Sequence, residues 1–291
     1  MIELKNEKIA IPVVLFAGLL WSFGPLVVRY MDEPGLVPWQ YIFARGLTIF
    51  IVLNLYLFFE EGQNFYKNYL KVGVSGLVGG CGLGIAMITF IYSITNTSAA
   101  VTLLCLAAMP FFTALLGFLF LKEKISFNVW VAIIIATIGI IIIALGNTEK
   151  NSLIGLIFGM TSSIGFSVFS VTLRWRKETP KFTTVAIAGL FCVITALLFI
   201  AINESTILST SYNGAMFSLH GTIVCMGLIL YSIGSKAIPA AELTLLSLTE
   251  VIGGIFWVWL PLFGINEIPS PNTIIGGFFL FMSIIYYSLT I

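Results

Sequence analysis

The sequence predicts an all-α membrane protein in which ten transmembrane helices form two inverted five-helix repeats around a central cavity. Three observations lead to this fold class: the composition, the long apolar stretches and a likeness between the two halves of the chain. Of the 291 residues, 59% are hydrophobic and only 9% are charged, and the mean hydropathy is +1.06. Soluble domains carry about a quarter charged residues, so this composition excludes a soluble globular protein.

A transmembrane helix needs about 20 mainly apolar residues, and short polar connections separate ten such stretches. The expected spans are 9–30, 38–59, 71–93, 98–121, 127–146, 153–173, 183–203, 215–235, 239–263 and 272–291. The first is longer than the apolar core of a signal peptide and lacks a small-residue cleavage site, so we expect it to be a retained helix. Only the segments around 60–70 and 174–182 are long enough for a brief surface helix.

The basic residues predict the orientation, because cytoplasmic loops of membrane proteins carry an excess of lysine and arginine. With the N-terminus inside, Arg29 and Lys150 lie on outer segments and Arg45 lies within the second span. The other eleven lie on inner segments: Lys5, Lys8, Lys67, Lys71, Lys122, Lys124, Arg174, Arg176, Lys177, Lys181 and Lys236. We therefore expect a multi-pass protein of the cytoplasmic (inner) membrane with both termini in the cytoplasm.

The two halves of the chain resemble each other in two places. Residues 19–30, LLWSFGPLVVRY, align with residues 164–175, IGFSVFSVTLRW, at a shift of 145. The segment that begins at Thr97 aligns with the segment that begins at Ile238, at a shift of 141. The alternative explanation is a chance likeness between apolar helices.

Each half, residues 1–150 and 151–291, contains five of the expected spans. An odd number of crossings turns the second copy upside down relative to the first. Many transporters use inverted repeats of this kind to expose one midplane site to either side of the membrane. The repeat therefore predicts a transporter.

Two segments resemble a known family. TSAAVTLLCLAAMPFFTALLGFLFLKEKIS, from Thr97 to Ser126, with the Ile-rich span that ends at Gly146, resembles the repeat signature of EamA-type drug/metabolite transporters. PAAELTLLSLTEVIGGIFWVWL, from Pro239 to Leu260, resembles the same signature. The resemblance implies a ten-helix secondary transporter of small organic molecules, often an exporter of amino acids or other metabolites. The sequence departs from the family pattern at Val251, where a proline is usual, and in the longer segment Phe263–Glu267.

Charged side chains inside a bilayer cost at least ~2.5 kcal/mol at a helix centre, so those within the spans need an explanation. Glu250 lies eleven residues beyond Pro239, or about 16 Å along a helix, which places it near the midplane. Arg45 lies about 10 Å from the outer face on the same arithmetic. We expect both to bind substrate, with Glu250 as a candidate proton carrier. The alternative is an ion pair that only fixes helix packing.

Other side chains at cavity depth are candidates for its walls, since small-molecule cavities are mostly apolar with a few polar groups. They are Trp21, Ser22, Phe166, Ser167, Tyr92, Tyr231, Ser247 and Trp257. For each of them the alternative is a packing role. His220 is expected at a solvated helix end, with a proton relay as the alternative.

Several features of the spans predict local structure. Pro25 and Pro110 each remove a helical hydrogen bond and predict disrupted helices in spans one and four. Six glycines between residues 73 and 84 predict close helix packing in span three. Glu242 is expected to complement the helix dipole in the first turn of span nine. The segment 122–124, Lys-Glu-Lys, is expected to be a solvated turn with local ion pairing only.

Other classes of function lack support. The net charge of +1 gives no field that attracts nucleic acid. One histidine and four unpaired cysteines, Cys81, Cys105, Cys192 and Cys225, offer no metal or disulfide pattern and no nucleophile with its base. No GxxxxGK[ST] loop is present for ATP. We therefore expect no enzyme activity, no metal and no cofactor.

The expected function is secondary active transport of a small polar or zwitterionic metabolite, an amino acid or a related compound, by alternating access. The family resemblance favours export. The expected partners are this substrate, a coupled proton and the lipid bilayer. The alternative is a passive facilitator or channel, or an uptake carrier, with the same fold. The sequence carries no signal for the identity of the substrate, the coupling ion or the oligomeric state.

Overall fold

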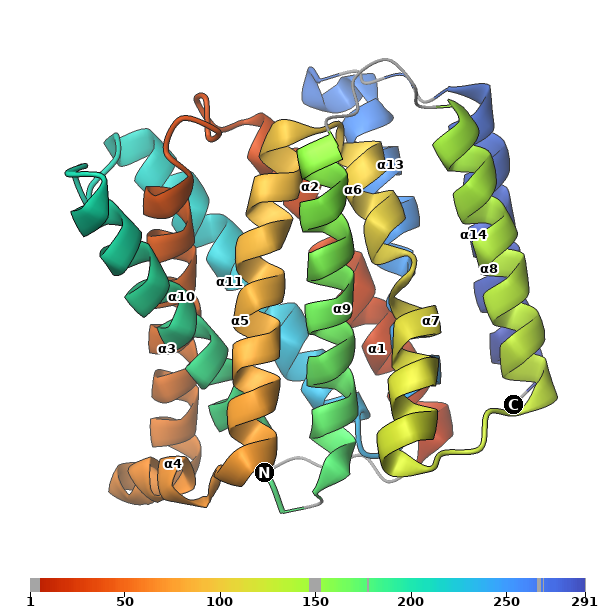
Figure 1. The fold of residues 1–291 in the computed structure, drawn as a ribbon, viewed down its shortest axis with the longest axis horizontal. Helices are drawn as coiled ribbons and strands as arrows, with labels where there is room; N and C mark the ends of the chain where they lie inside the picture. The colour runs from red at the N-terminus through yellow and green to blue at the C-terminus, as the bar shows by residue number, and fades with distance from the viewer. Residues whose placement is uncertain (1–5, 147–152, 177, 266–267, 269, 291) are drawn as a thin grey trace.

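The chain forms a bundle of helices that run between two opposite faces (Figure 1). The structure is a computed structural model and describes residues 6–146, 153–176, 178–265, 268 and 270–290. The regular secondary structure in these ranges is helical throughout. The expected repeat boundary at 150/151, the basic residues Lys5, Lys150 and Lys177, and residues 266–267 of the lengthened segment lie outside the described residues.

The helices of both halves have clear bounds. The first half contains α1 (Glu7–Trp21), α2 (Phe23–Arg29), α3 (Pro38–Glu61), η1 (Gly62–Tyr66), α4 (Lys67–Lys71), α5 (Gly73–Asn96), α6 (Ala99–Leu106), α7 (Met109–Leu116), η2 (Gly117–Leu121) and α8 (Phe127–Gly146). The second half contains α9 (Leu153–Trp175), α10 (Lys181–Ile202), α11 (Ser211–Gly234), α12 (Ala240–Leu246), α13 (Thr249–Trp259), η3 (Pro261–Phe263) and α14 (Pro271–Thr290).

Eight helical stretches are long and apolar enough to cross a bilayer, and they coincide with eight of the expected spans. The other two expected spans, 127–146 and 272–291, correspond to α8 and α14. Their apolar parts within the described residues, Phe127–Ile142 and Ile274–Tyr287, are shorter. α8 and α14 pack against each other at one edge of the bundle (Figure 1). The protein is therefore an all-helical, multi-span membrane protein, and the number of ten spans stays a prediction.

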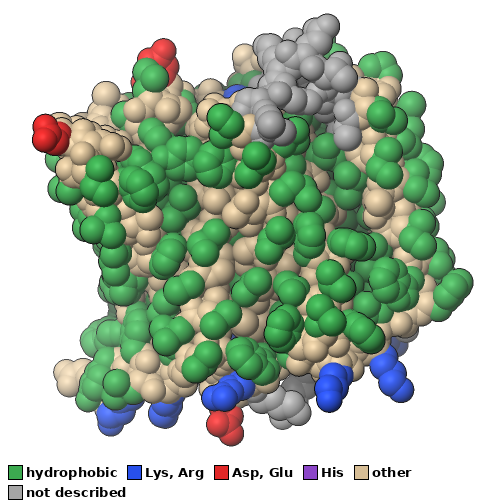
Figure 2. All heavy atoms as spheres, in the orientation of Figure 1, with side chains coloured by type: hydrophobic (Ala, Val, Ile, Leu, Met, Phe, Trp, Pro, Cys, Tyr) green, Lys and Arg blue, Asp and Glu red, His purple; other side chains and the backbone are tan. Residues whose placement is uncertain are grey.

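The surface agrees with a membrane setting. Figure 2 shows hydrophobic side chains over the middle of the molecule and basic side chains along the lower edge. α1 begins and α14 ends at this same face (Figure 1). The segment around residues 60–70, one of the two long enough for a surface helix, forms η1 and α4, and a turn lies at Glu178 between α9 and α10. The assignment of this face to the cytoplasm stays a prediction.

Two spans are broken in their middle at the predicted prolines. α1 ends and α2 begins around Ser22, and α6 and α7 are separated at residues 107–108. Pro25 and Pro110 have no amide hydrogen, so the carbonyl groups of Trp21 and Leu106 lose their helical partners. The predicted disruptions are therefore confirmed.

A third break, between α12 and α13, forms without a proline. Here the amide of Glu250 donates to the carbonyl of Ser247 at 2.9 Å, and the amide of Val251 donates to that of Leu248 at 3.0 Å. These bonds join residues three apart, as in a 3₁₀ turn, and tighten the chain locally. Val251, which stands where the family usually has a proline, thus still lies at a helix break.

Glu123 and Arg174 join three segments at the lower face. Arg174 Nε donates to Glu123 Oε1 at 2.6 Å, and Arg174 Nη1 donates to the Ile238 carbonyl at 2.6 Å. The amide of Ala240, at the start of α12, donates to Glu123 Oε2 at 3.3 Å. The prediction of only local ion pairing at residues 122–124 is wrong, because the fold brings the end of α9 beside this turn.

Glycines allow the helices to cross with their backbones in contact. A Cβ atom on Gly165 of α9 would lie 2.6 Å from the carbonyl oxygen of Gly82 in α5. A Cβ atom on Gly189 of α10 would lie 2.8 Å from the carbonyl oxygen of Gly46 in α3. These spacings leave no room for a side chain. The predicted close packing of span three is confirmed.

Replacing Gly165 by alanine therefore tests the α5–α9 crossing. The added methyl group meets backbone rather than a flexible side chain, and overpacking of this kind costs ~1–3 kcal/mol. We expect Gly165→Ala to lower the apparent melting temperature of the protein purified in detergent. The control is Gly214→Ala in α11, where no atom lies within 4 Å of the added Cβ. Equal melting temperatures for the two variants would contradict a tight crossing.

Candidate functional site

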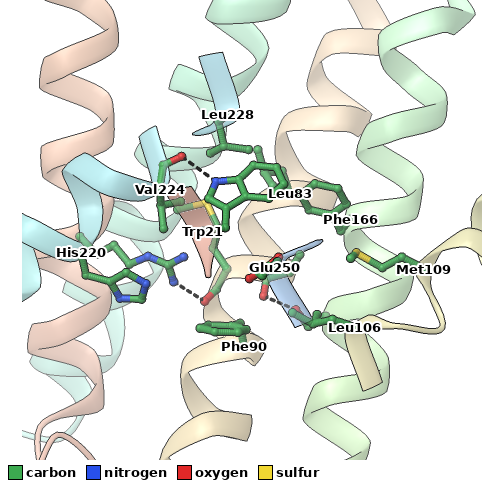
Figure 3. Close-up of a pocket in the computed structure, with 14 residues that line it drawn as sticks. Trp21, Leu83, Phe90, Leu106, Met109, Phe166, His220, Val224, Leu228 and Glu250 are labelled. Carbon is green, nitrogen blue, oxygen red and sulfur yellow. Dashed lines mark hydrogen bonds between the residues drawn. The ribbon is translucent and has the colours of Figure 1, made fainter. Parts of the chain in front are cut away.

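A cavity of about 60 Å³ lies at the level of the helix breaks, between the two halves of the chain. Its walls come from α1, α3, α5, α6 and α7 of the first half and from α9, α11 and α13 of the second (Figure 3). The lining residues are Trp21, Arg45, Leu83, Ala86, Met87, Phe90, Leu106, Met109, Ser162, Phe166, His220, Val224, Leu228 and Glu250. This space holds only a few water molecules, so a larger ligand requires the helices to move apart.

Arg45 supplies the positive charge of the cavity. Its side chain is 5% exposed, and Nη1 donates a long hydrogen bond of 3.4 Å to the Met87 carbonyl. The guanidinium carbon lies 5.6 Å from the centroid of the Phe90 ring, within cation–π range. Among the described residues, Nε has no hydrogen-bond partner. A buried guanidinium with an unused donor is costly for the fold and is well placed to bind an anionic group.

Glu250 supplies the acidic group of the cavity, from the first turn of α13 beside the third helix break. Figure 3 shows it among Trp21, Phe90 and Leu106. Within the part of the chain that the structure describes, its carboxyl group makes no hydrogen bond or ion pair, and none joins it to Arg45. The structure thus brings the two predicted charges, one from each half, to a single cavity and leaves both open to a ligand.

Trp21 and Phe166 form an aromatic wall, with ring centroids 5.6 Å apart and planes nearly perpendicular. The indole nitrogen of Trp21 donates to the Val224 carbonyl at 3.1 Å. A Cβ atom on Gly227 would lie 2.2 Å from that nitrogen, so only glycine leaves room for the ring. Tyr231 packs behind the wall, 5.5 Å from Trp21 and 5.2 Å from Phe166, and supports it rather than lining the cavity.

The three predicted serines lie beside the cavity, not on its surface. Ser22, Ser167 and Ser247 are fully buried, and each hydroxyl group donates to a carbonyl of the same span, at 2.6, 2.8 and 2.7 Å. Ser22 Oγ also accepts a hydrogen bond of 2.8 Å from Trp257 Nε1, and the Trp257 ring stacks on Phe23. These side chains stabilise the broken helices that shape the cavity.

Two further predicted residues lie away from the cavity. Tyr92 packs against Trp39 and Phe158, at centroid distances of 5.4 and 5.1 Å. Glu242, in the first turn of α12, accepts a hydrogen bond from the hydroxyl group of Tyr287 in α14. This bond ties two spans together and agrees with the structural part expected for Glu242.

Two polar lining residues, His220 and Ser162, are not among the predicted substrate-binding residues. Ser162 donates its hydroxyl hydrogen to the Ala86 carbonyl at 2.8 Å, and His220 makes a contact of a different kind. Its side chain is 1% exposed, and its Nδ1 is hydrogen-bonded to the hydroxyl group of Tyr41. The expected position at a solvated helix end is wrong, because α11 begins at Ser211 and His220 lies well inside it. The sequence does carry a signal for Tyr41: it lies four residues before Arg45, so the two side chains share one face of the helix. Apolar lining residues such as Met87 and Phe90 carry no such signal.

The fold and cavity define a helical membrane protein with a charged central site between its halves, and known proteins share this chain's sequence pattern. Residues 8–145 match the EamA-like transporter family. An uncharacterized transporter of Helicobacter pylori strain J99 is 28% identical over 60% of this chain and 56% of its own length. The match therefore spans little more than half of that relative.

Two other comparisons extend over more of the relatives. The pseudopaline exporter CntI of Pseudomonas aeruginosa PAO1 is 23% identical over 70% of this chain and 71% of its own length. A protein of known crystal structure superposes with a TM-score of 0.74 over 98% of this chain and 99% of its own, at 18% identity. That likeness shows a shared fold. The match of residues 8–145 agrees with the resemblance to EamA-type drug/metabolite transporters seen in the sequence.

Replacing Arg45 by methionine tests whether the arginine holds the fold together. The change removes a buried charge whose Nε has no hydrogen-bond partner among the described residues, and with it the cost of burying that charge, and it keeps an unbranched side chain. We expect Arg45→Met to raise the apparent melting temperature. The control, Arg174→Met, breaks the ion pair with Glu123 and should lower it. A fall for Arg45→Met as large as that for the control would mean that Arg45 is a packing element.

Proposed function

We propose that this chain is a secondary active transporter that moves a small polar or zwitterionic metabolite, an amino acid or a related compound, across the cytoplasmic membrane. The observation that carries this proposal is one cavity with an open cation from one half and an open carboxylate from the other. A guanidinium group recognises a carboxylate, and the Glu250 carboxylate complements an ammonium group. Trp21 and Phe166 offer an apolar surface to the rest of the molecule.

The packing of the helices supports the proposed inverted repeats, residues 1–150 and 151–291. In the proposed repeat, α1 corresponds to α9 and α11 corresponds to α5. The contact between α1 and α11 then corresponds to the contact between α9 and α5, and both pairs of helices pack together. The second spans of the two halves, α3 and α10, correspond to each other, as do the fifth spans, α8 and α14. Symmetry allows each of these pairs to pack together, and both contacts are present. The breaks near Leu106 and Ser247 are separated by the shift of 141 seen in the sequence.

Alternating access follows from where the helices are broken. Breaks in α1/α2, α6/α7 and α12/α13 adjoin the cavity, and unwound backbone is tolerated in a membrane where it lines such a space. In inverted-repeat transporters, gating of one half against the other exposes the midplane site to either side. We propose that the half-helices bend at these breaks and enlarge the cavity toward one face at a time.

Export is the proposed direction, and a gradient is the proposed energy source. The relative CntI is named as an exporter, which supports this direction for the present chain. The sequence lacks a phosphate-binding loop for ATP. Glu250, a carboxylate in a small cavity, is the proposed carrier of a coupled proton.

A screen of the purified protein against amino acids, amines, purines and organic acids tests the proposed substrate class. A ligand that binds the folded state raises the apparent melting temperature. We expect amino acids to give larger shifts than amines or acids that carry one charged end. Glu250→Gln should remove the shift and slow uptake of the best ligand into proteoliposomes by at least about tenfold, because one buried charge partner is lost. The control is Glu178→Gln, in the exposed turn between α9 and α10.

Three results would count against the proposal. Wild-type uptake by Glu250→Gln, with unchanged pH dependence, would remove Glu250 from the mechanism. Shifts by amines and acids as large as those by amino acids would contradict a site for zwitterions. Uptake of labelled ligand that is not accelerated by unlabelled ligand on the opposite side would favour a passive channel over alternating access.

A further inference from the structure

Tyr41, Arg45 and His220 form a polar corner of the cavity on the side away from the α13 break. Tyr41 and Arg45 are four residues apart in α3, so their side chains leave the same face of that helix. α11 crosses α3 at this point, since a Cβ atom on Gly221 would lie 3.0 Å from the Arg45 carbonyl oxygen. This close crossing places the neighbouring His220 beside Arg45.

The hydrogen bond to Tyr41 fixes the orientation and the tautomer of His220. In the described part of the chain, the Tyr41 hydroxyl group and His220 Nδ1 have no hydrogen-bond partner other than each other. We assign the hydroxyl group as the donor, because donation by Nδ1 would leave both the hydroxyl hydrogen and the Nε2 lone pair without a partner. The neutral imidazole then carries its proton on Nε2. Both side chains are at most 1% exposed, so the pair is sealed from lipid.

The Nε2–H group of His220 is a hydrogen-bond donor. Nε2 lies against the backbone of α2, 2.9 Å from the position of a Cβ on Gly24. No acceptor for it is found in the residues that the structure describes. The rings of His220 and Phe90 are 6.4 Å apart, and Arg45 lies over the same Phe90 ring. His220 and Arg45 both line the cavity, and within the described residues His220 Nε2 and Arg45 Nε have no hydrogen-bond partner.

The helices around this corner supply no negative charge. Neither α2, α5 nor α11 contains an aspartate or a glutamate, and the acidic residues of α3, Glu60 and Glu61, lie at its far end. Glu250 stands on α13 at the other side of the cavity. A corner with a guanidinium group, an imidazole N–H and no carboxylate is suited to an anion.

We propose that His220 is a specificity residue for a carboxylate, which His220 Nε2–H and the Arg45 guanidinium group bind together. Tyr41 is a positioning residue, because it holds the imidazole in the tautomer that can donate. This inference rests on the proposed function and adds a direction to it: the carboxylate end of the substrate lies at α3 and α11, and its ammonium end lies at α13. A molecule that lacks the carboxylate leaves both donors unused.

Ligands that differ only in their charged ends test this assignment. The probes are L-phenylalanine, 3-phenylpropionate and phenethylamine, with L-alanine, propionate and ethylamine as a second set. Their affinities for purified wild type, His220→Asn and His220→Phe are measured by calorimetry in detergent. We expect His220→Phe to weaken the two carboxylate-bearing probes of a set by about tenfold or more and to leave the amine unchanged, because a hydrogen bond to a charged group is lost. His220→Asn, which keeps an N–H donor, should show a smaller loss.

Tyr41→Phe provides the positioning test and covers the case in which His220→Phe fails to fold. It removes only the hydroxyl group, and we expect a loss of about two- to fivefold for the carboxylate probes alone. The control is Tyr69→Phe, whose hydroxyl group bonds to Asn54 Oδ1 at 2.8 Å, away from the cavity. Equal losses for amines and carboxylates, or no loss in His220→Phe and Tyr41→Phe, would overturn the inference. No binding of any probe by wild type would instead overturn the proposed function.

Discussion

The structure depends on the high cost of placing a charge or an unpaired backbone group in lipid. Arg45 and Glu250 carry charges at the depth of the bilayer, and the carbonyl groups of Trp21 and Leu106 lose their helical donors to prolines. All four residues line one cavity. Both halves of the chain contribute to its walls, so these groups are turned away from lipid. The cavity thus shields these charged side chains and unpaired carbonyl groups from lipid.

Close helix crossings give the cavity its shape. Gly82 and Gly165 let α5 and α9 touch, and Gly221 lets α11 lie on the backbone of α3. These contacts bring aromatic rings and charges from distant parts of the chain within a few ångströms. Gly227 leaves room for the Trp21 ring, which packs against α11 and donates a hydrogen bond to the Val224 carbonyl. Small residues in the helices therefore position the large and polar ones in the cavity.

The charges of the cavity do not follow the proposed repeat. Met109 and Glu250 are separated by the shift of 141, both follow a helix break, and both line the cavity. One is a thioether and the other is a carboxylate. The proposed repeat thus accounts for two similar helical frameworks, whereas the residues of the site differ between the halves. An asymmetric site suits a ligand with two different ends.

Eight of the ten expected spans, the resemblance to EamA-like transporters over residues 8–145 and two of the three helix breaks could be predicted from the sequence, because hydropathy, motifs and proline are local properties. The sequence also identified Arg45 and Glu250, since charges stand out in an apolar span. The tertiary structure decided that His220 is buried on Tyr41, that Ser22, Ser167 and Ser247 bond within their own spans, and that Glu123 reaches Arg174. The break between α12 and α13 also emerged only there. The burial of His220 on Tyr41 and the pairing of Glu123 with Arg174 depend on contacts between helices far apart in the chain, which no local pattern encodes.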